Sequence, residues 1–179
     1  GFNSIGIASA GGAGRVTAEW MINDHINEDL FSLDIKRFQK FHSSKKFIME
    51  RVTETLGDLY GMHWPYKQHT TSRNQKKSAI HEELKNMGAC FGVAGGYERP
   101  MWFAINGKKP IYEYSFNYQN WYPSAEFETI NTSKNVGFFE MSSFSKFDLK
   151  GENIHEELQK ICTANIKNDP GKSTYTQML

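Results

Sequence analysis

The chain has 179 residues, of which 39% are hydrophobic and 23% are charged, as expected of a globular protein with one sizeable core or two small ones. Its 21 basic and 20 acidic side chains leave a formal charge of +1, without the basic excess that a nucleic-acid-binding surface needs. No apolar run approaches the roughly 20 residues that span a bilayer, and the first residues lack the basic segment of a signal peptide. We therefore expect neither a nucleic-acid partner nor a membrane.

The two cysteines, Cys90 and Cys162, lie far apart in the sequence. Their separation matches no metal-binding or redox spacing. We expect two buried thiols in a reducing compartment.

Apolar side chains that recur every three or four residues predict three helices in the first half of the chain. Serine before such a segment and glycine after it are typical of helix ends. The predicted helices cover residues 12–24, Ser43 or Ser44 to Gly61, and Ser78 to Gly88.

Beyond residue 88 the pattern changes to one typical of strands. Short apolar segments at residues 89–93 and 101–105 flank Gly95-Gly96, and Asn106-Gly107 predicts a tight turn. Aromatic residues at every second position of 112–118 predict a further strand, whose aromatic face packs within a sheet.

The last third of the chain is expected to mix strands and helices. Its predicted elements are a helix at 124–135, strands at 136–141 and 144–149, a helix at 152–162, a turn at 169–171 and a strand from Ser173.

The glycine-rich start of the chain runs directly into the first predicted helix. Glycine lets a backbone approach a ligand closely, and free N–H groups at a helix start favour negative charge. Gly12-Ala13-Gly14 begins a dinucleotide fingerprint, and Asp34 stands at the distance of its ribose-binding acid, but Thr17 replaces its last glycine. A dinucleotide phosphate, the ring of a flavin and a plain tight helix start are all compatible with this segment.

Three groups of motifs resemble the dimethylglycine and sarcosine dehydrogenase family. The end of its flavin domain is similar to the segments at residues 1–4, 10–14, 18–22 and 34–38. Its central domain is similar to His63-Trp64-Pro65 and to the segments at 71–73, 81–84, 88–92 and 98–103. The opening of its aminomethyltransferase-like, folate-binding domain resembles residues 136–147 and 171–179.

This resemblance implies an α+β chain that is an internal piece of a longer protein. Residues 1–40 would be the C-terminal end of the FAD-dependent oxidoreductase domain, and residues 41–122 its small central α+β domain. Residues 123–179 would be the N-terminal part of the aminomethyltransferase-like folate-binding domain, as in the glycine cleavage T-protein.

The resemblance also implies an FAD-dependent oxidoreductase that acts on CH–NH groups of N-methylated glycine, with dimethylglycine or sarcosine as substrate. FAD accepts a hydride from the N-methyl group, and tetrahydrofolate takes up the one-carbon unit. Seven residues are expected to line the flavin: Asn3, Ser4, Ile5, Gly6, Ile7, Gly11 and Gly12. Phe144 is expected to form part of the folate pocket.

The catalytic groups and the flavin-linking histidine are expected outside this chain, so we expect the chain alone to be inactive. Electrons would pass to oxygen or to an electron-transfer flavoprotein. We expect a cytoplasmic location in a bacterium, or the mitochondrial matrix in a eukaryote.

Other candidate residues are interpreted as structural. Neither His63 and His69 nor His81 and His155 show the spacing of a zinc-binding helix, so no metal is expected. Arg99 either anchors a carboxylate or ties two segments together.

Two other functions remain open. A regulatory relative of the same architecture would have lost catalysis and would act as a partner of a phosphatase. A folate-dependent aminomethyltransferase would keep the front half as a scaffold only.

Overall fold

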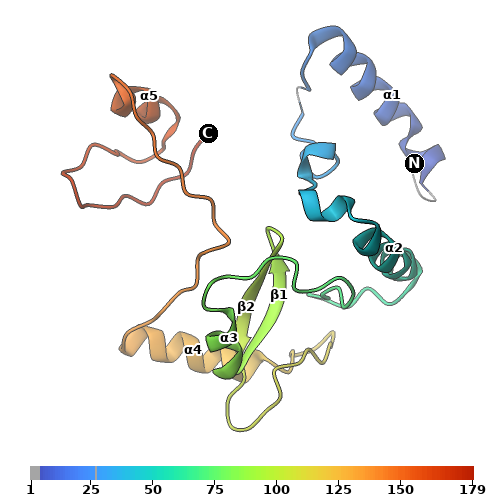
Figure 1. Cartoon of the computed structure of the whole chain (residues 1–179). Coiled ribbons are helices and arrows are strands. Elements are labelled where there is room, and N and C mark those ends of the chain that lie inside the picture. Colours follow the sequence, from blue (N-terminus) through green and yellow to red (C-terminus); the bar gives the residue numbers. More distant parts are fainter. Residues whose placement is uncertain (1–4, 27) are drawn as a thin grey trace. The chain divides into compact units, whose positions relative to one another are not determined.

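The computed structural model describes residues 5–26 and 28–179. They fall into two compact units, Gly1–Glu140 and Met141–Leu179. Eight elements of the first unit are, in chain order, α1 (Gly6–Asn23), η1 (Ile35–Arg37), η2 (Lys40–Ser43), α2 (Lys45–Tyr60), α3 (His81–Asn86), β1 (Ala89–Ala94), β2 (Tyr97–Phe103) and α4 (Tyr122–Lys134) (Figure 1). The second unit contains α5 (Ile154–Ile161).

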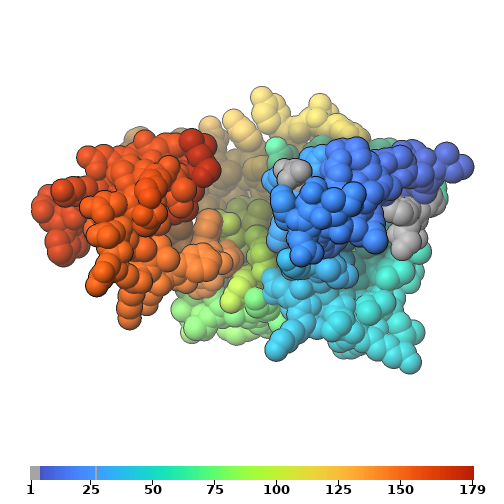
Figure 2. Space-filling view, turned by 90° about the horizontal axis from the view of Figure 1, so that it is seen from above, coloured from blue at the N-terminus to red at the C-terminus, as the bar shows by residue number. Residues whose placement is uncertain are grey.

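Helix α1 begins six residues before the predicted start at residue 12. The prediction was wrong because it took the glycines for a helix break, whereas Ala8, Ala10 and Ala13 between them are strong helix formers. The C-cap, Asp24, adopts the left-handed conformation with φ 61°, and its N–H bonds to the carbonyl of Trp20, close to the predicted end. None of the described side chains of α1, which is drawn in blue in Figure 2, is buried.

Helix α2 has the predicted ends. The hydroxyl of Ser44 accepts a hydrogen bond from the N–H of Phe47, and Gly61 is the C-cap. Phe47 is the buried residue of this helix, and it lies edge-on to Phe41 and His42 of η2. An aromatic cluster therefore joins η2 to the start of α2.

The centre of the first unit is the antiparallel hairpin of β1 and β2, which is the only sheet among the described residues. Strand β2 begins at Tyr97, four residues before the predicted segment, and a bulge lies between Cys90 and Phe91. Helix α3 packs against β1 and α4 packs against β2 (Figure 1). The buried apolar side chains here are Leu84, Ala89, Cys90 and Trp102.

The hairpin turn requires glycine at position 96. Gly96 has φ +81°, and a Cβ there would lie 2.9 Å from Nε2 of Gln39. That amide is held in place, because it donates to the carbonyl of Gly95 over 2.9 Å and its oxygen accepts from Lys76 over 2.8 Å.

We expect Gly96→Ala to lower the free energy of unfolding by about 1–3 kcal/mol, because it adds backbone strain and displaces Gln39. Chemical denaturation measures the change. Gly57→Ala is the control, since Gly57 lies in α2 with open space around it. An equal effect of both substitutions would contradict the account of the turn.

The aromatic segment at 112–118 is not a strand, contrary to the prediction. Side chains replace a strand partner: Asn120 bonds the N–H of Glu113 and the carbonyl of Ile111, and Gln119 bonds Ser115. The alternation still places Tyr112 and Tyr114 on one side, with their rings stacked 5.6 Å apart. The turn at Asn106-Gly107 is confirmed, with φ 55° and 73°.

The last third has the predicted helices but lacks the predicted strands. Helix α4 begins at Tyr122, so Ser124 lies inside it rather than at its cap, and α5 occupies most of 152–162. No strand forms at 136–141, at 144–149 or from Ser173, because no neighbouring strand pairs with these segments within the described residues. Cys162 and Met178 form an isolated bridge instead.

Helices with a small sheet confirm the predicted α+β class. Cys90 and Cys162 are free and buried, as predicted. Among the described residues, no helix combines the length and the apolar character needed to cross a membrane.

Candidate functional site

The residues predicted to face the flavin lie at the start of α1. Ile5 is the N-cap, followed by Gly6 and Ile7 in the first turn. Because the first N–H groups of a helix have no partner within it, this end is suited to negative charge. Ile7 is 98% exposed, so its side chain makes almost no contact with the described residues. Asn3 and Ser4 lie outside the described residues.

Gly11 and Gly12 do not lie at a helix start, which corrects the prediction. They follow the first turn of α1, where backbone N–H groups bond within the helix. These two glycines therefore present a helix surface without side chains to a ligand, and they do not provide free N–H donors. Apart from the adjacent residues and the nearby backbone of the helix itself, no described heavy atom lies within 4 Å of a Cβ built on either glycine.

Phe144, the predicted folate residue, lies in the second unit and is 48% exposed. Its N–H donates to the carbonyl of Met141 over 3.1 Å. The ammonium of Lys146 donates to the carbonyls of both residues, over 2.7 Å each. These bonds hold residues 141–146 in a compact turn that presents the ring of Phe144.

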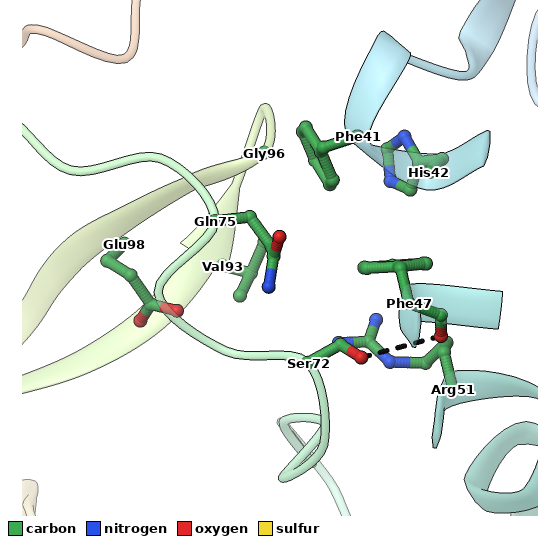
Figure 3. A pocket seen from close by; sticks show the side chains of 9 residues that line it. All are labelled: Phe41, His42, Phe47, Arg51, Ser72, Gln75, Val93, Gly96 and Glu98. Atoms are coloured by element: carbon green, nitrogen blue, oxygen red, sulfur yellow. Dashed lines mark hydrogen bonds between the residues drawn. The ribbon is translucent and has the colours of Figure 1, made fainter. Parts of the chain in front are cut away.

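A pocket that the sequence did not predict lies between η2, α2 and the hairpin (Figure 3). Its lining combines aromatic, polar and charged side chains: Phe41, His42, Phe47, Arg51, Ser72, Gln75, Val93, Gly96 and Glu98. The space inside is about 20 Å³, enough for one water molecule. This volume excludes an amino-acid substrate from the pocket in this conformation.

The polar groups of the pocket are held by the protein itself. The guanidinium of Arg51 donates to the carbonyl of Thr71 over 2.6 Å and lies 5.0 Å from the centre of the Phe47 ring. Ser72 donates to Glu50 over 2.8 Å. Burial lowers the pKa of His42, whose Nδ1 accepts from the N–H of Gln39 over 2.9 Å. The polar groups of the pocket therefore connect neighbouring segments of the protein to one another.

One of the lining residues, Glu98, forms a buried ion pair with Arg73. The guanidinium meets the carboxylate at 2.5 and 2.9 Å, and Glu98 is 3% exposed. Burial by itself raises the pKa of Glu98, but hydrogen bonds from Arg73 and the N–H of Asn74 outweigh it and leave the pKa below its ordinary value. The pair joins the loop before α3 to strand β2.

The remaining sequence candidates have structural positions. Asp34, considered as a ribose-binding acid, caps η1 by accepting from the N–H of Lys36 over 2.7 Å. Trp102 is buried in the hairpin. His81 is buried against the ring of Phe91, whereas His155 is exposed on α5. His69 lies beside two acidic residues of α2, a grouping that the sequence analysis missed.

Two family models match consecutive parts of the chain. The FAD dependent oxidoreductase central domain matches residues 23–78, and the GCVT N-terminal domain matches residues 80–179. The chain thus spans the junction of a protein class that joins these two domains. The domain boundaries predicted after residues 40 and 122 stay a prediction.

Similar proteins cover the whole chain. It is 37% identical to 4-methylaminobutanoate oxidase (formaldehyde-forming) of Paenarthrobacter nicotinovorans over 179 residues, which are 22% of that protein. It is 28% identical to human mitochondrial sarcosine dehydrogenase over 204 aligned positions, 22% of that protein. It is 30% identical to the mouse mitochondrial pyruvate dehydrogenase phosphatase regulatory subunit over 184 positions, 21% of that protein.

The chain belongs to the dimethylglycine and sarcosine dehydrogenase family, in which an FAD dependent oxidoreductase central domain precedes a GCVT domain. It spans about a fifth of the length of the curated relatives that it matches.

Proposed function

We propose that the protein containing this chain is an FAD-dependent oxidoreductase that demethylates an N-methylated amino acid. The observation that carries the proposal is the order of the two matched domains along one chain, shared with relatives named as an oxidase and a dehydrogenase of N-methyl amino acids. Bound FAD would accept the hydride of the N-methyl group, which leaves an iminium on the substrate. Oxygen or an electron-transfer flavoprotein would then accept the electrons.

The fate of the one-carbon unit distinguishes two versions of this function. Attack of water on the iminium releases formaldehyde and the demethylated amine, and one relative is named for forming formaldehyde. Attack by tetrahydrofolate instead yields methylene-tetrahydrofolate and the same amine. We favour transfer to folate because of the GCVT match, with Phe144 in the wall of the folate pocket.

A product assay on the intact protein tests the proposal. Sarcosine, dimethylglycine and 4-methylaminobutanoate are supplied in turn, and formaldehyde is measured with and without tetrahydrofolate. We expect one of them to be demethylated, with less free formaldehyde when folate is present. Turnover with unchanged formaldehyde would reject the folate step, and no turnover of any amine would reject the oxidoreductase.

For the flavin site, we propose that the first turn of α1 and the bare surface at Gly11 and Gly12 approach the flavin ring. Alanine at either position is compatible with the helix and is expected to favour it by about 1 kcal/mol. We nevertheless expect Gly11→Ala and Gly12→Ala to lower the flavin content of the purified protein several-fold, because the new methyl group occupies the approach.

The absorbance ratio of flavin to protein measures this effect. Gly57→Ala in α2 is the matched control, since its Cβ position likewise has no described atom within 4 Å beyond the adjacent residues and the nearby helix backbone. Full flavin content in both α1 variants would remove these glycines from the proposed site.

The second candidate is a regulatory subunit without oxidoreductase activity. It is favoured by the 30% identity to the phosphatase regulatory subunit, which spans the whole chain. Such a protein would show no amine-dependent reduction of flavin.

We place the protein in the bacterial cytoplasm, or in the mitochondrial matrix if its source is a eukaryote.

A further inference from the structure

Three potential metal ligands meet at the C-terminal half of α2. Glu54 and Asp58 lie one turn apart on the same helix face, where like charges repel unless a cation lies between or beside them. The loop after the helix brings in His69, whose Nδ1 lies 3.7 Å from Oε2 of Glu54 and 3.6 Å from Oδ2 of Asp58. One nitrogen and two carboxylate oxygens therefore converge within 4.8 Å of one another.

The position of the His69 nitrogen is the strongest observation. The His69 side chain is 43% exposed, but its Nδ1 atom has almost no accessible surface and no hydrogen-bond partner among the described residues, although two carboxylates face it. Zinc binds nitrogen and oxygen at about 2.0–2.2 Å, so tetrahedral ligand atoms lie about 3.3–3.6 Å apart. The two distances from Nδ1 to the carboxylate oxygens are too long for good hydrogen bonds, and they are close to the distances between ligand atoms around one zinc ion.

Both carboxylates are oriented by further contacts, as metal ligands commonly are. Oε1 of Glu54 accepts from the N–H and hydroxyl of Thr70, over 2.5 and 2.8 Å. Oε2 accepts from the N–H of Thr71 over 3.0 Å and also from the hydroxyl of Thr71. The ammonium of Lys67 bonds Oδ1 of Asp58 and leaves Oδ2 towards His69. Glu54 stays ionised, because these bonds outweigh burial and lower its pKa to about 2.

The same face also has room for an additional ligand such as water. An open pocket of about 190 Å³ is lined by Asp58, His63 and His69 among others. Two cations oppose metal binding, Lys67 on Asp58 and Arg51 at 3.6 Å from Glu54. Lys67 contacts Oδ1 of Asp58 and leaves Oδ2 to face Nδ1, whereas Arg51 lies near Oε2 of Glu54, the oxygen that also faces Nδ1, so a metal ion must compete with Arg51 there.

We propose that Glu54, Asp58 and His69 bind one divalent transition-metal ion of the Zn²⁺ type, through a single oxygen of each carboxylate and Nδ1 of His69. An imidazole together with carboxylates suits Zn²⁺, whereas Mg²⁺ and Ca²⁺ prefer sites in which every ligand is an oxygen. The ion ties the loop at residues 62–71 to α2 and is a structural element separate from the flavin. The proposal therefore stands or falls independently of the proposed oxidoreductase activity.

Calorimetric titration of the chelator-treated intact protein with Zn²⁺ alone tests the site. We expect one equivalent to bind, and His69→Ala and Asp58→Asn each to weaken that binding at least about tenfold. His155→Ala and Asp148→Asn are matched controls, because both residues are exposed and lie outside the group of three ligands. We expect both control variants to bind Zn²⁺ with the affinity of the parent protein. Circular dichroism verifies that each variant is folded.

Equal Zn²⁺ affinity in the cluster variants and the controls would overturn the proposal, as would the absence of any binding at 1:1 stoichiometry. If His69→Ala fails to fold, Co²⁺ absorption of the parent compared with Asp58→Asn decides the matter. A tetrahedral Co²⁺ spectrum that Asp58→Asn leaves unchanged would likewise reject the site, and the three residues would then form an ion pair only.

Discussion

Replacement of Glu98 by alanine is expected to lower the free energy of unfolding by about 3–5 kcal/mol, a large share of the stability of a typical domain. The carboxylate is 3% exposed and accepts hydrogen bonds from the guanidinium of Arg73 and the N–H of Asn74. Without it, Arg73 keeps a half-buried positive charge with only the carbonyls of His69 and Phe91 as partners among its described contacts. The loss is large because a charge remains unpaired in a poorly hydrated place.

Urea unfolding of the intact protein, followed by tryptophan fluorescence, measures this loss. Glu82→Ala is the matched control: its carboxylate pairs with Lys77 over 3.2 Å, but its side chain is 63% exposed. Exposed pairs contribute about 0–1 kcal/mol, so the control should change little. A Glu98→Ala effect as small as that of Glu82→Ala would contradict the assigned role of the buried pair.

The second large effect concerns the dependence of stability on pH through Glu54. Its carboxylate is 11% exposed and receives bonds from the backbone and hydroxyl groups of Thr70 and Thr71. Burial raises its pKa, but these bonds prevail and lower it from 4.5 to about 2. The difference corresponds to about 3 kcal/mol of stability.

Because the folded-state pKa is below the unfolded one, this stabilisation is complete above about pH 4.5 and is lost as the pH falls towards 2. Glu54→Gln removes it at every pH. We therefore expect the parent to exceed the variant in stability by about 2–3 kcal/mol at pH 7, and the gap to close between pH 4.5 and 2.

Unfolding free energies of both chelator-treated, metal-free proteins across this pH range check the expectation, with Glu83→Gln as the exposed control on α3. A gap that stays constant as the pH falls would show that the hydrogen bonds to Glu54 do not depend on its charge.

Local signals in the sequence predicted the helices best. Ser44 and Gly61 mark the ends of α2, and Asn106-Gly107 marks a tight turn, because each depends on residues that are close in sequence. The strand prediction at 112–118 was wrong. Alternation of side chains indicates which of them share a face, but a strand also needs a neighbouring strand with which its backbone can form hydrogen bonds. Side chains of Gln119 and Asn120 satisfy that backbone instead.

The sites depend on contacts between distant residues, which explains what the sequence analysis missed. Glu54 and Asp58 have the spacing of one helix face, so two of the three potential metal ligands could be paired from the sequence. The approach of His69 depends on the path of the loop after Gly61, which no local pattern encodes. The same holds for Arg73 and Glu98, which are 25 positions apart.

The most direct test of the central claim is the anaerobic visible spectrum of the intact protein during titration with sarcosine, dimethylglycine and 4-methylaminobutanoate. We predict a bound flavin whose absorbance near 450 nm, typical of oxidised flavin, is bleached by at least one of these amines, since the N-methyl hydride passes to FAD. A protein without flavin, or a flavin that none of the amines reduces, would contradict the proposed oxidoreductase and favour the regulatory alternative.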